Sequence, residues 1–191
     1  SKFPQAAGDF CLPPGYLAFF AQDFQAPRFH RHYLTVPQLL QAALAARGDR
    51  PLVIKPHPNN SPDERAVLLA HHAPDQGVHV TDASIHAILP GAACVLTVTS
   101  AVGFEAFLHR KPVVLAGQTD FGQNAITLTD PARLTEAIST AMARDWPHEK
   151  FVTWFLRHRL LEDRPSSLPV LMARLQRKGI GFANAAGPGF Y

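Results

Sequence analysis

Short apolar runs recur along the chain, separated by stretches in which apolar residues return at helical spacing. The runs lack the apolar–polar alternation of a strand with one solvent face, so they are typical of strands buried on both faces of a parallel sheet. The predicted strands are Tyr16–Ala21, Pro51–Lys55, Val78–Val80, Ala93–Thr97, Pro112–Leu115 and the less apolar Ala125–Leu128.

The stretches between these runs predict helices. Val36–Arg47 places its leucines on one face and is followed by Gly48, a residue that often ends helices. Ser61 or Asp63 is the expected cap of a second helix, which runs to about His72. Two more helices are predicted, at Ala101–His109 and from Asp130-Pro131 to about Arg144.

Regular strand–helix alternation favours an α/β fold: a doubly wound, mostly parallel, six-stranded Rossmann-like sheet with right-handed crossovers. We expect 1–15 to be an entry segment or linker, 16–145 the Rossmann-like domain, 146–178 helices that pack on it, and 179–191 a flexible tail. In such sheets ligands bind at the carboxyl ends of the strands. Polar residues that directly follow a strand are therefore the first candidates for a site.

Composition narrows the classes of function. Hydrophobic residues make up 47% and charged residues 17%, which is typical of a soluble globular protein, and no apolar run is long enough for a membrane span. The net charge of +3 comes from scattered Lys and Arg, which suits an anionic ligand but not a nucleic acid. Cys11 and Cys94 are unclustered and the histidines lack metal-ligand spacing, so we expect no metal site.

The first candidate segment is Lys55-Pro56-His57-Pro58, directly after a predicted strand. Prolines on both sides of His57 restrict the backbone, and a rigid loop that presents an imidazole suits binding of a phosphate. Lys55 adds positive charge nearby. The alternative is a proline-rich turn in which His57 merely bonds to backbone, and we favour the phosphate site.

The second candidate is the segment from Thr97 to Ala106, where a buried strand leads into small hydroxyl residues and then a helix. Helix N-termini attract phosphate, and Thr99 and Ser100 can donate hydroxyls to the same oxygens. Gly103 allows close approach of a ligand or a neighbouring backbone, and the Glu105 carboxylate can accept from ribose hydroxyls. The alternative is an ordinary N-cap with an ordinary first-turn acid.

Three further strand ends carry polar residues. Asp82 is placed to read a nucleotide base, or to cap the following helix. Gln118 lies in a glycine-bearing loop that lines the cleft or merely connects two elements. Gln22 and Asp23 follow the first strand at the same edge, and the basic, aromatic segment Arg28–Tyr33 comes after them. A solvated surface is the favoured interpretation of that segment.

The order of three motifs resembles the capsule polysaccharide biosynthesis proteins, which include bacterial β-Kdo transferases that use CMP-Kdo. These motifs are Lys55–Pro58, Thr99–Ala106 and Lys111–Val114, and the resemblance covers roughly residues 16–140. The motifs are also similar to those of bacterial sialyltransferases and of CDP-glycerol glycerophosphotransferases. No G-x-G-x-x-G, P-loop or G-x-S-x-G motif is present, which removes the main support for dehydrogenase, P-loop and hydrolase functions.

The resemblance implies one half of a GT-B architecture, in which these motifs belong to the C-terminal, nucleotide-binding domain. It implies that His57 and Ser100 bind the CMP phosphate, that Thr99 supports them and that Glu105 binds ribose. Gln22 and Asp23 match the family pattern only in part, and Thr99 stands where a second serine is expected. The catalytic carboxylates of such enzymes lie mostly in the N-terminal domain, which we expect this chain to lack.

The sequence therefore predicts the donor-binding domain of a surface-polysaccharide glycosyltransferase that transfers Kdo or a similar sugar from a CMP-sugar, without a cofactor. The expected partners are the donor, a glycan or glycolipid acceptor and the N-terminal domain, and the expected location is the cytoplasm, including the inner face of the inner membrane. The chain begins at Ser1, and we expect it to be a fragment with little activity alone. A CDP-glycerol-type glycerophosphotransferase domain and a non-catalytic binding domain remain alternatives.

Overall fold

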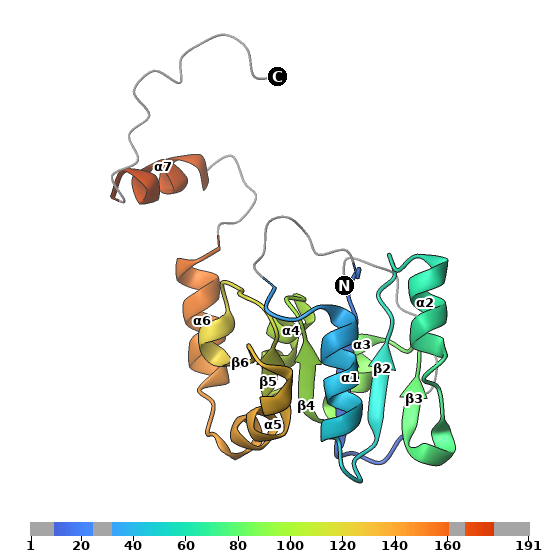
Figure 1. Cartoon of the computed structure of the whole chain (residues 1–191). Helices are drawn as coiled ribbons and strands as arrows, with labels where there is room; N and C mark the ends of the chain where they lie inside the picture. The colour runs from blue at the N-terminus through green and yellow to red at the C-terminus, as the bar shows by residue number, and fades with distance from the viewer. Residues whose placement is uncertain (1–9, 25–31, 161–166, 178–191) are drawn as a thin grey trace. The chain divides into compact units, whose positions relative to one another are not determined.

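The computed structural model describes residues 10–24, 32–160 and 167–177. Its contacts divide the chain into two units, with the division after Val152. The first unit contains a six-stranded sheet in which every pair of neighbours is parallel (Figure 1). The doubly wound α/β fold predicted from the sequence is therefore confirmed, with a wholly parallel sheet.

The six strands lie close to the positions that the apolar runs predict. They are β1 (Tyr16–Phe20), β2 (Leu52–Lys55), β3 (Val78–Val80), β4 (Ala92–Thr97), β5 (Val113–Leu115) and β6 (Ile126–Thr127). Most of their residues are buried, as strands covered on both faces require. The weakest apolar run yields the shortest strand, β6.

The helices of the first unit connect these strands. They are α1 (Val36–Ala46), α2 (Pro62–Leu69), α3 (Ile85–Ile88), α4 (Val102–Leu108) and α5 (Leu134–Ala143). Short 3-10 turns lie at η1 (Pro74–Gln76), η2 (Leu89–Gly91), η3 (Gly122–Asn124) and η4 (Pro131–Arg133). Asp130 caps η4, and the helix predicted to open at Asp130-Pro131 becomes α-helical only at Leu134.

Two capping boxes explain where α1 and α2 begin. The Thr35 side chain accepts from Gln38 N while the Gln38 side chain accepts from Thr35 N, and Ser61 and Glu64 do the same for α2. Each helix also has a proline in its first turn. Proline fits there because the backbone nitrogens of the first turn donate no intrahelical hydrogen bond. After α1, Gly48 adopts a positive φ of 57° and turns the chain toward β2.

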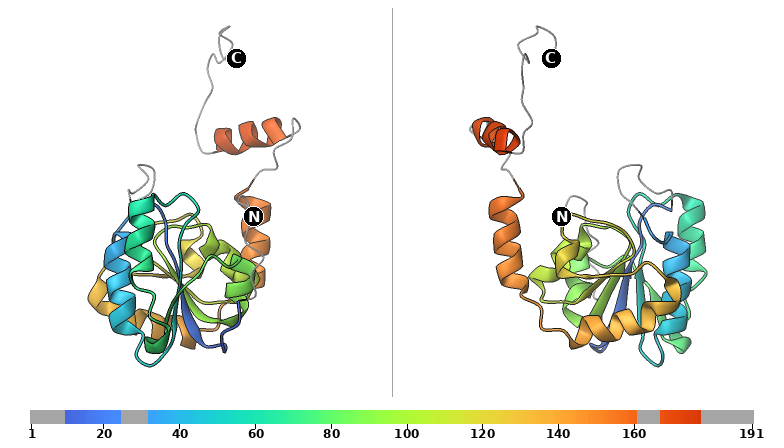
Figure 2. Two further views of the ribbon diagram at one scale, coloured as in Figure 1. Left: turned by 90° about the vertical axis from the view of Figure 1, so that its right-hand side faces the viewer. Right: turned by 60° about the vertical axis from the view of Figure 1, so that its left-hand side comes forward.

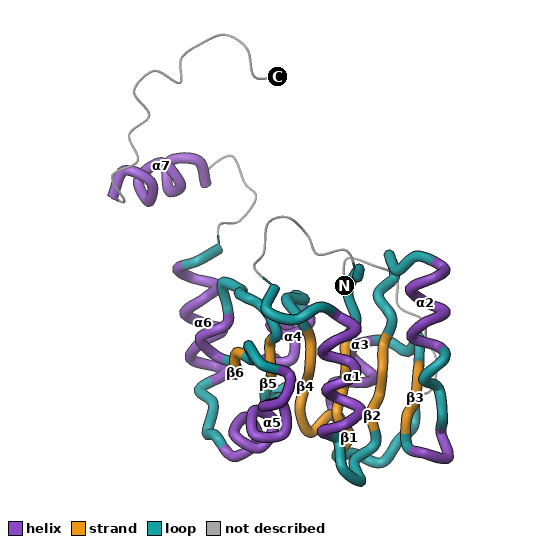
Figure 3. Tube along the Cα trace, in the orientation of Figure 1, coloured by secondary structure: helices purple, strands orange, loops and turns teal. Residues whose placement is uncertain are grey.

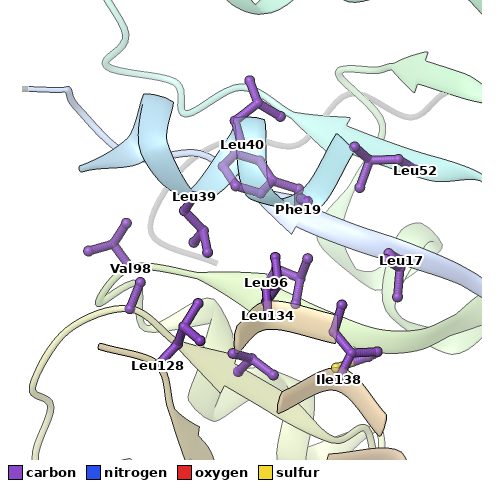
Figure 4. Close-up of a cluster of buried hydrophobic side chains, with 14 of the residues drawn as sticks. Leu17, Phe19, Leu39, Leu40, Leu52, Leu96, Val98, Leu128, Leu134 and Ile138 are labelled. Atoms are coloured by element: carbon purple, nitrogen blue, oxygen red, sulfur yellow. The ribbon is translucent and has the colours of Figure 1, made fainter. Parts of the chain in front are cut away.

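The main hydrophobic core lies between the sheet and helices α1 and α5 (Figure 4). Leu39 and Leu40 of α1 and Leu134 of α5 pack there against Phe19 and Leu96 of the two central strands. Helices α3 and α4 lie on the opposite face (Figures 1 and 2). Fully burying each such side chain contributes about 1.5–3 kcal/mol, so this three-layer packing holds the strand ends in place.

Helix α6 (His148–His158) begins in the first unit and continues into the second, which also holds α7 (Ser167–Arg177). Within the second unit, Arg174 of α7 donates to the backbone oxygens of Arg157 and Leu160. The limits predicted for the entry segment, the domain, the C-terminal helices and the tail stay predictions. Among the helices that the structure describes, none combines the length and the apolar character that crossing a bilayer would take.

Candidate nucleotide site at the carboxyl edge of the sheet

The strand order is β3-β2-β1-β4-β5-β6, so the winding direction changes between β1 and β4. The chain leaves β1 toward β2 and leaves β4 toward β5, and the loops that follow the two central strands diverge. The carboxyl edge at such a switch point is the usual ligand position in doubly wound sheets. Loops from this edge lie along the upper side of the first unit in Figure 3.

Gln22 joins the two strands at this switch point. Its Oε1 accepts from the Thr99 backbone N–H at 2.6 Å, and its Nε2 donates to the Thr99 Oγ1 at 3.2 Å. Two residues earlier, at the end of β4, Thr97 Oγ1 donates to the Phe20 backbone oxygen at 3.0 Å. The ends of β1 and β4 are thus fastened by side chains as well as by the sheet. Gln22 and Thr99, both predicted from the sequence as site residues, lie in direct contact.

A third group reaches Thr99 from a segment whose role the sequence left open. His32 Nε2 lies 3.2 Å from Thr99 Oγ1. The backbone holds His32 there, because it forms an isolated bridge with Gly117 and the next two amides, of Tyr33 and Leu34, donate to the Ala116 oxygen. His32 belongs to the cluster interpreted as a solvated surface. No local pattern distinguishes it from its neighbours, so only the tertiary structure identifies it.

The His57 loop follows β2, the neighbour of β1 on the other side. The Asn59 backbone N–H donates to His57 Nδ1 at 3.1 Å, so the neutral ring carries its proton on Nε2. Burial lowers the pKa of His57, and the nearby Lys55 charge adds to this, while the Asp23 carboxylate opposes it. His57 therefore presents a neutral N–H donor at neutral pH. Asp23, itself exposed, contributes through its charge.

Lys55, at the end of β2, and Asp82, after β3, form a separate contact. The Lys55 side chain is 8% exposed and donates from Nζ to the Asp82 backbone oxygen at 3.2 Å. Burial lowers its pKa, which the Asp82 carboxylate partly offsets. The Asp82 carboxylate itself pairs with Arg65 of α2. The alternative role of Asp82 as a helix cap is wrong, because Ser84 caps α3 by accepting from His86 N.

Ser100 and Gly103 form the turn that starts α4. Ser100 Oγ accepts from Val102 N at 3.3 Å, and the Ser100 backbone oxygen accepts from Gly103 N. A Cβ on Gly103 would lie 3.1 Å from Phe121 and 3.3 Å from Leu115. The glycine therefore allows α4 to pack closely on side chains of β5 and its loop, where a ligand or a neighbouring backbone was expected from the sequence.

Glu105 and Gln118 lie beside other parts of the first unit. The Glu105 Oε2 is 3.9 Å from His86 Nε2 of α3, and the ring of His86 in turn contacts His109. Gln118 is exposed in the loop after β5, next to the Gly117 that pairs with His32. The structure thus joins Gln22 and Thr99 directly, places His57 one strand away, and puts Glu105 against a neighbouring helix.

A cavity of about 790 Å³ lies at the opposite edge of the sheet. It is lined by Arg110, Arg144, Trp146 and Lys150 together with two acids. Arg110 pairs with Glu149, and the Arg144 guanidinium lies 4.4 Å above the Trp146 ring. One basic side chain of this groove is thus paired with an acid, and another lies over an aromatic ring. Within the described ranges, no three His, Cys, Asp or Glu side chains are grouped so as to hold a metal ion.

Comparisons with known proteins fit this fold. The model of the family "Capsule polysaccharide biosynthesis protein" matches residues 25–149. No curated protein matches the chain. A UDP-GlcNAc 2-epimerase from Methanocaldococcus jannaschii, solved with UDP-GlcNAc and UDP, is 12% identical over 76% of this chain and 45% of its own, with a TM-score of 0.52.

A second structure of the same epimerase is 11% identical over 73% of this chain and 42% of its own, with a TM-score of 0.56. The beta Kdo 2,4 transferase KpsC from Thermosulfurimonas dismutans is 20% identical over 72% of this chain and 47% of its own, with a TM-score of 0.46. The chain spans less than half the length of these proteins. At such identities the epimerases support the fold alone, which corresponds to half of a GT-B-like molecule.

Proposed function

Because the chain belongs to the capsule polysaccharide biosynthesis protein family, we propose that it is the nucleotide-binding part of a glycosyltransferase. The proposed donor is a CMP-sugar, with Kdo or a similar sugar as the group transferred. The observation that carries the proposal is the contact of Gln22 with Thr99 at the switch point, with the His57 loop beside it. These are the strand ends at which doubly wound sheets bind nucleotides.

The proposed chemistry is stabilisation of a leaving phosphate. As the sugar departs, negative charge develops on the CMP phosphate, and preorganised donors in a partly buried site stabilise it. His57 supplies the Nε2–H donor, and Ser100 and Thr99 supply hydroxyls. Lys55 contributes positive charge from its buried position behind the loop. The acceptor, a glycan or glycolipid, and the catalytic carboxylates are assigned to the remainder of the glycosyltransferase.

Nucleotide binding by the 191-residue chain tests the proposal. We expect isothermal titration calorimetry to detect CMP binding and expect His57→Ala and Ser100→Ala each to weaken it about tenfold or more, since each removes a hydrogen bond to a charged group. His71→Ala is the matched control, because His71 lies beyond the far end of α2, where its backbone N–H donates to the Leu68 oxygen. Undiminished affinity in both site variants would contradict the assignment of the site.

The choice of nucleotide separates the alternatives. Tighter binding of CDP-glycerol than of CMP-Kdo would favour glycerol-phosphate transfer, because that donor carries two phosphates. The epimerase structure contains UDP, so UMP and UDP belong in the same titration series, and preference for uridine nucleotides would overturn the CMP assignment. Nucleotide binding without transfer, even with the remainder of the protein present, would favour a non-catalytic binding domain.

A further inference from the structure

Two residues outside the predicted site, Asn60 and Glu64, connect the His57 loop to the end of β1. They lie at the turn between β2 and α2 and in the first turn of α2. Each contacts chain segments that are distant in sequence. Their contacts determine where the His57 ring lies relative to Gln22 and Thr99.

Asn60 uses both ends of its side-chain amide. Its Oδ1 accepts from the His57 backbone N–H at 2.6 Å, and its Nδ2 donates to the Gln22 backbone oxygen at 2.9 Å. The Asn60 backbone N–H closes the turn by donating to the His57 oxygen at 3.0 Å. A single side chain therefore links the residue that carries the imidazole to the residue that clamps Thr99.

Glu64 orients Asn60 and reaches β1 independently. Its Oε2 accepts from Asn60 Nδ2 at 3.0 Å and from Ser61 N at 3.0 Å, while its Oε1 accepts from Phe24 N at 3.0 Å. Burial alone would raise the pKa of Glu64, but these donors outweigh it and the pKa is lowered. The carboxylate therefore stays ionised and holds three donors at once.

The capping box of α2 explains only part of this arrangement. Capping requires the carboxylate to accept from the Ser61 N–H, which occupies one oxygen. The other oxygen accepts from Phe24, forty positions earlier in the chain. This second contact stabilises the position of the β1 loop and not the helix, so Glu64 does more than cap α2.

We propose that Asn60 and Glu64 are positioning residues of the nucleotide site, which hold the His57 loop against the end of β1. Through them the turn brings the Asn59 amide onto His57 Nδ1 and so keeps the ring proton on Nε2, where a phosphate oxygen is to accept it. That this ring proton serves to bind a phosphate rests on the proposed function. The geometric claim itself concerns the state of the His57 ring and can be measured without a nucleotide.

The test combines three variants with a matched control. Asn60→Ala removes all three side-chain hydrogen bonds, to His57, Gln22 and Glu64. Asn60→Asp keeps an acceptor for the His57 amide but loses the donor to Gln22 and Glu64. Glu64→Gln keeps the shape but replaces one acceptor oxygen by a donor. Asp63→Asn is the control, because it removes an exposed carboxylate one residue earlier on the same helix. Circular dichroism first establishes that each variant is folded at the temperature used.

Nitrogen-15 NMR of the imidazole rings is the primary measurement. In the parent chain and in Asp63→Asn, we expect His57 to show a neutral ring protonated on Nε2. In the three site variants we expect a mixture of tautomers, because the Asn59 N–H no longer donates steadily to His57 Nδ1. We also expect the pKa of His57 to lie closer to the ordinary histidine value, because the ring is less buried. We also expect CMP binding to weaken about tenfold or more in each site variant, with little change in Asp63→Asn.

The possible results separate the two claims. His57 signals unchanged in all folded site variants would overturn the positioning role, whether or not CMP binds. Altered His57 signals in a chain whose parent form binds no nucleotide would support the positioning of the ring and would contradict the proposed function instead. A lower melting temperature with unchanged ring signals and unchanged CMP affinity would assign Asn60 and Glu64 to stability alone.

Discussion

Tyr16 and Gly91 meet at the amino edge of the sheet. The Tyr16 hydroxyl donates to the Ile88 backbone oxygen at 2.5 Å, and burial raises the pKa of this tyrosine to about 12. A Cβ on Gly91 would lie 2.6 Å from the Tyr16 hydroxyl oxygen and 2.8 Å from its ring. The absence of a side chain at position 91 is thus what allows Tyr16 to reach its partner.

We therefore expect Gly91→Ala to lower the free energy of unfolding by about 1–3 kcal/mol, because the tyrosine must move and a packed core resists this. Urea denaturation followed by circular dichroism measures the change. Gly122→Ala serves as control, since the nearest atoms to its Cβ would lie at 3.4 and 3.9 Å, which are ordinary contacts. Equal stability of the two variants would show that the Tyr16 contact is easily rearranged.

Residue types and their flanking residues identified several candidates but not their partners. The prolines around His57 and the hydroxyls after β4 mark these positions in the sequence. Ser61 and Glu64 also form a recognisable capping-box pattern, from which the helix start could be predicted. The contact of Glu64 with Phe24 and that of His32 with Thr99 have no local signal, because they depend on where distant loops come to lie.

At the scale of elements, the end of β1 is fastened to the end of β4 by the Gln22 side chain. Thr99 is 8% exposed while the Gln22 side chain covers it, and its backbone N–H donates to Gln22 Oε1. Leaving a buried donor without its partner costs about 1–3 kcal/mol. The contact between the two strands therefore contributes both to stability and to the geometry of the candidate site.

We expect Gln22→Ala to lower the free energy of unfolding by about 1–3 kcal/mol and to weaken CMP binding as well. Chemical denaturation and calorimetry measure the two effects. Gln123→Ala is the control, because that glutamine is exposed on η3. A Gln22→Ala variant as stable as Gln123→Ala would mean that water replaces the lost amide and that the contact between Gln22 and Thr99 is not needed for stability.

Strand positions were predictable from local patterns to within one or two residues, since strands buried on both faces read as continuous apolar runs. Helix boundaries were less predictable. The stretch from Asp130 begins as a 3-10 turn, and α3 begins after Ser84 and not Asp82. Several residue types can cap a helix, and the choice among neighbours depends on the path of the preceding loop.

At the scale of the whole molecule, buried imidazoles make stability depend on pH. His148 is 6% exposed, stacks on Phe107 with ring centroids 5.2 Å apart, and accepts from Asn124 Nδ2 at Nδ1 over 2.8 Å. Burial lowers the pKa of His148, and also those of His57, His79 and His109. The folded chain therefore binds fewer protons than the unfolded chain below pH 6.5.

The stability that these neutral rings contribute is fully present above about pH 6.5, the value for an unfolded histidine. It is lost as the pH falls below 6.5 through the lowered pKa values of the folded state. We expect the free energy of unfolding, measured in urea, to drop by an amount on the order of 1 kcal/mol or more between pH 7.5 and pH 5.

His148→Phe tests the most deeply buried of these rings, because phenylalanine keeps the aromatic stack and cannot be protonated. We expect this variant to lose less stability than the parent chain over the same pH interval, whatever its stability at pH 7.5. Parallel curves for the two proteins would show that His148 does not contribute to the acid dependence.

The sequence by itself determined the class of fold, the approximate place of each strand and the family. Both the apolar runs of strands buried on two faces and the short motifs consist of residues that are neighbours in the chain. Only the tertiary structure decided that β1 lies between β2 and β4. That order brings Gln22 onto Thr99, 77 positions away, and places Asn60 between His57 and Gln22. Such contacts depend on strand order, register and loop path together, and no local pattern of residues encodes these.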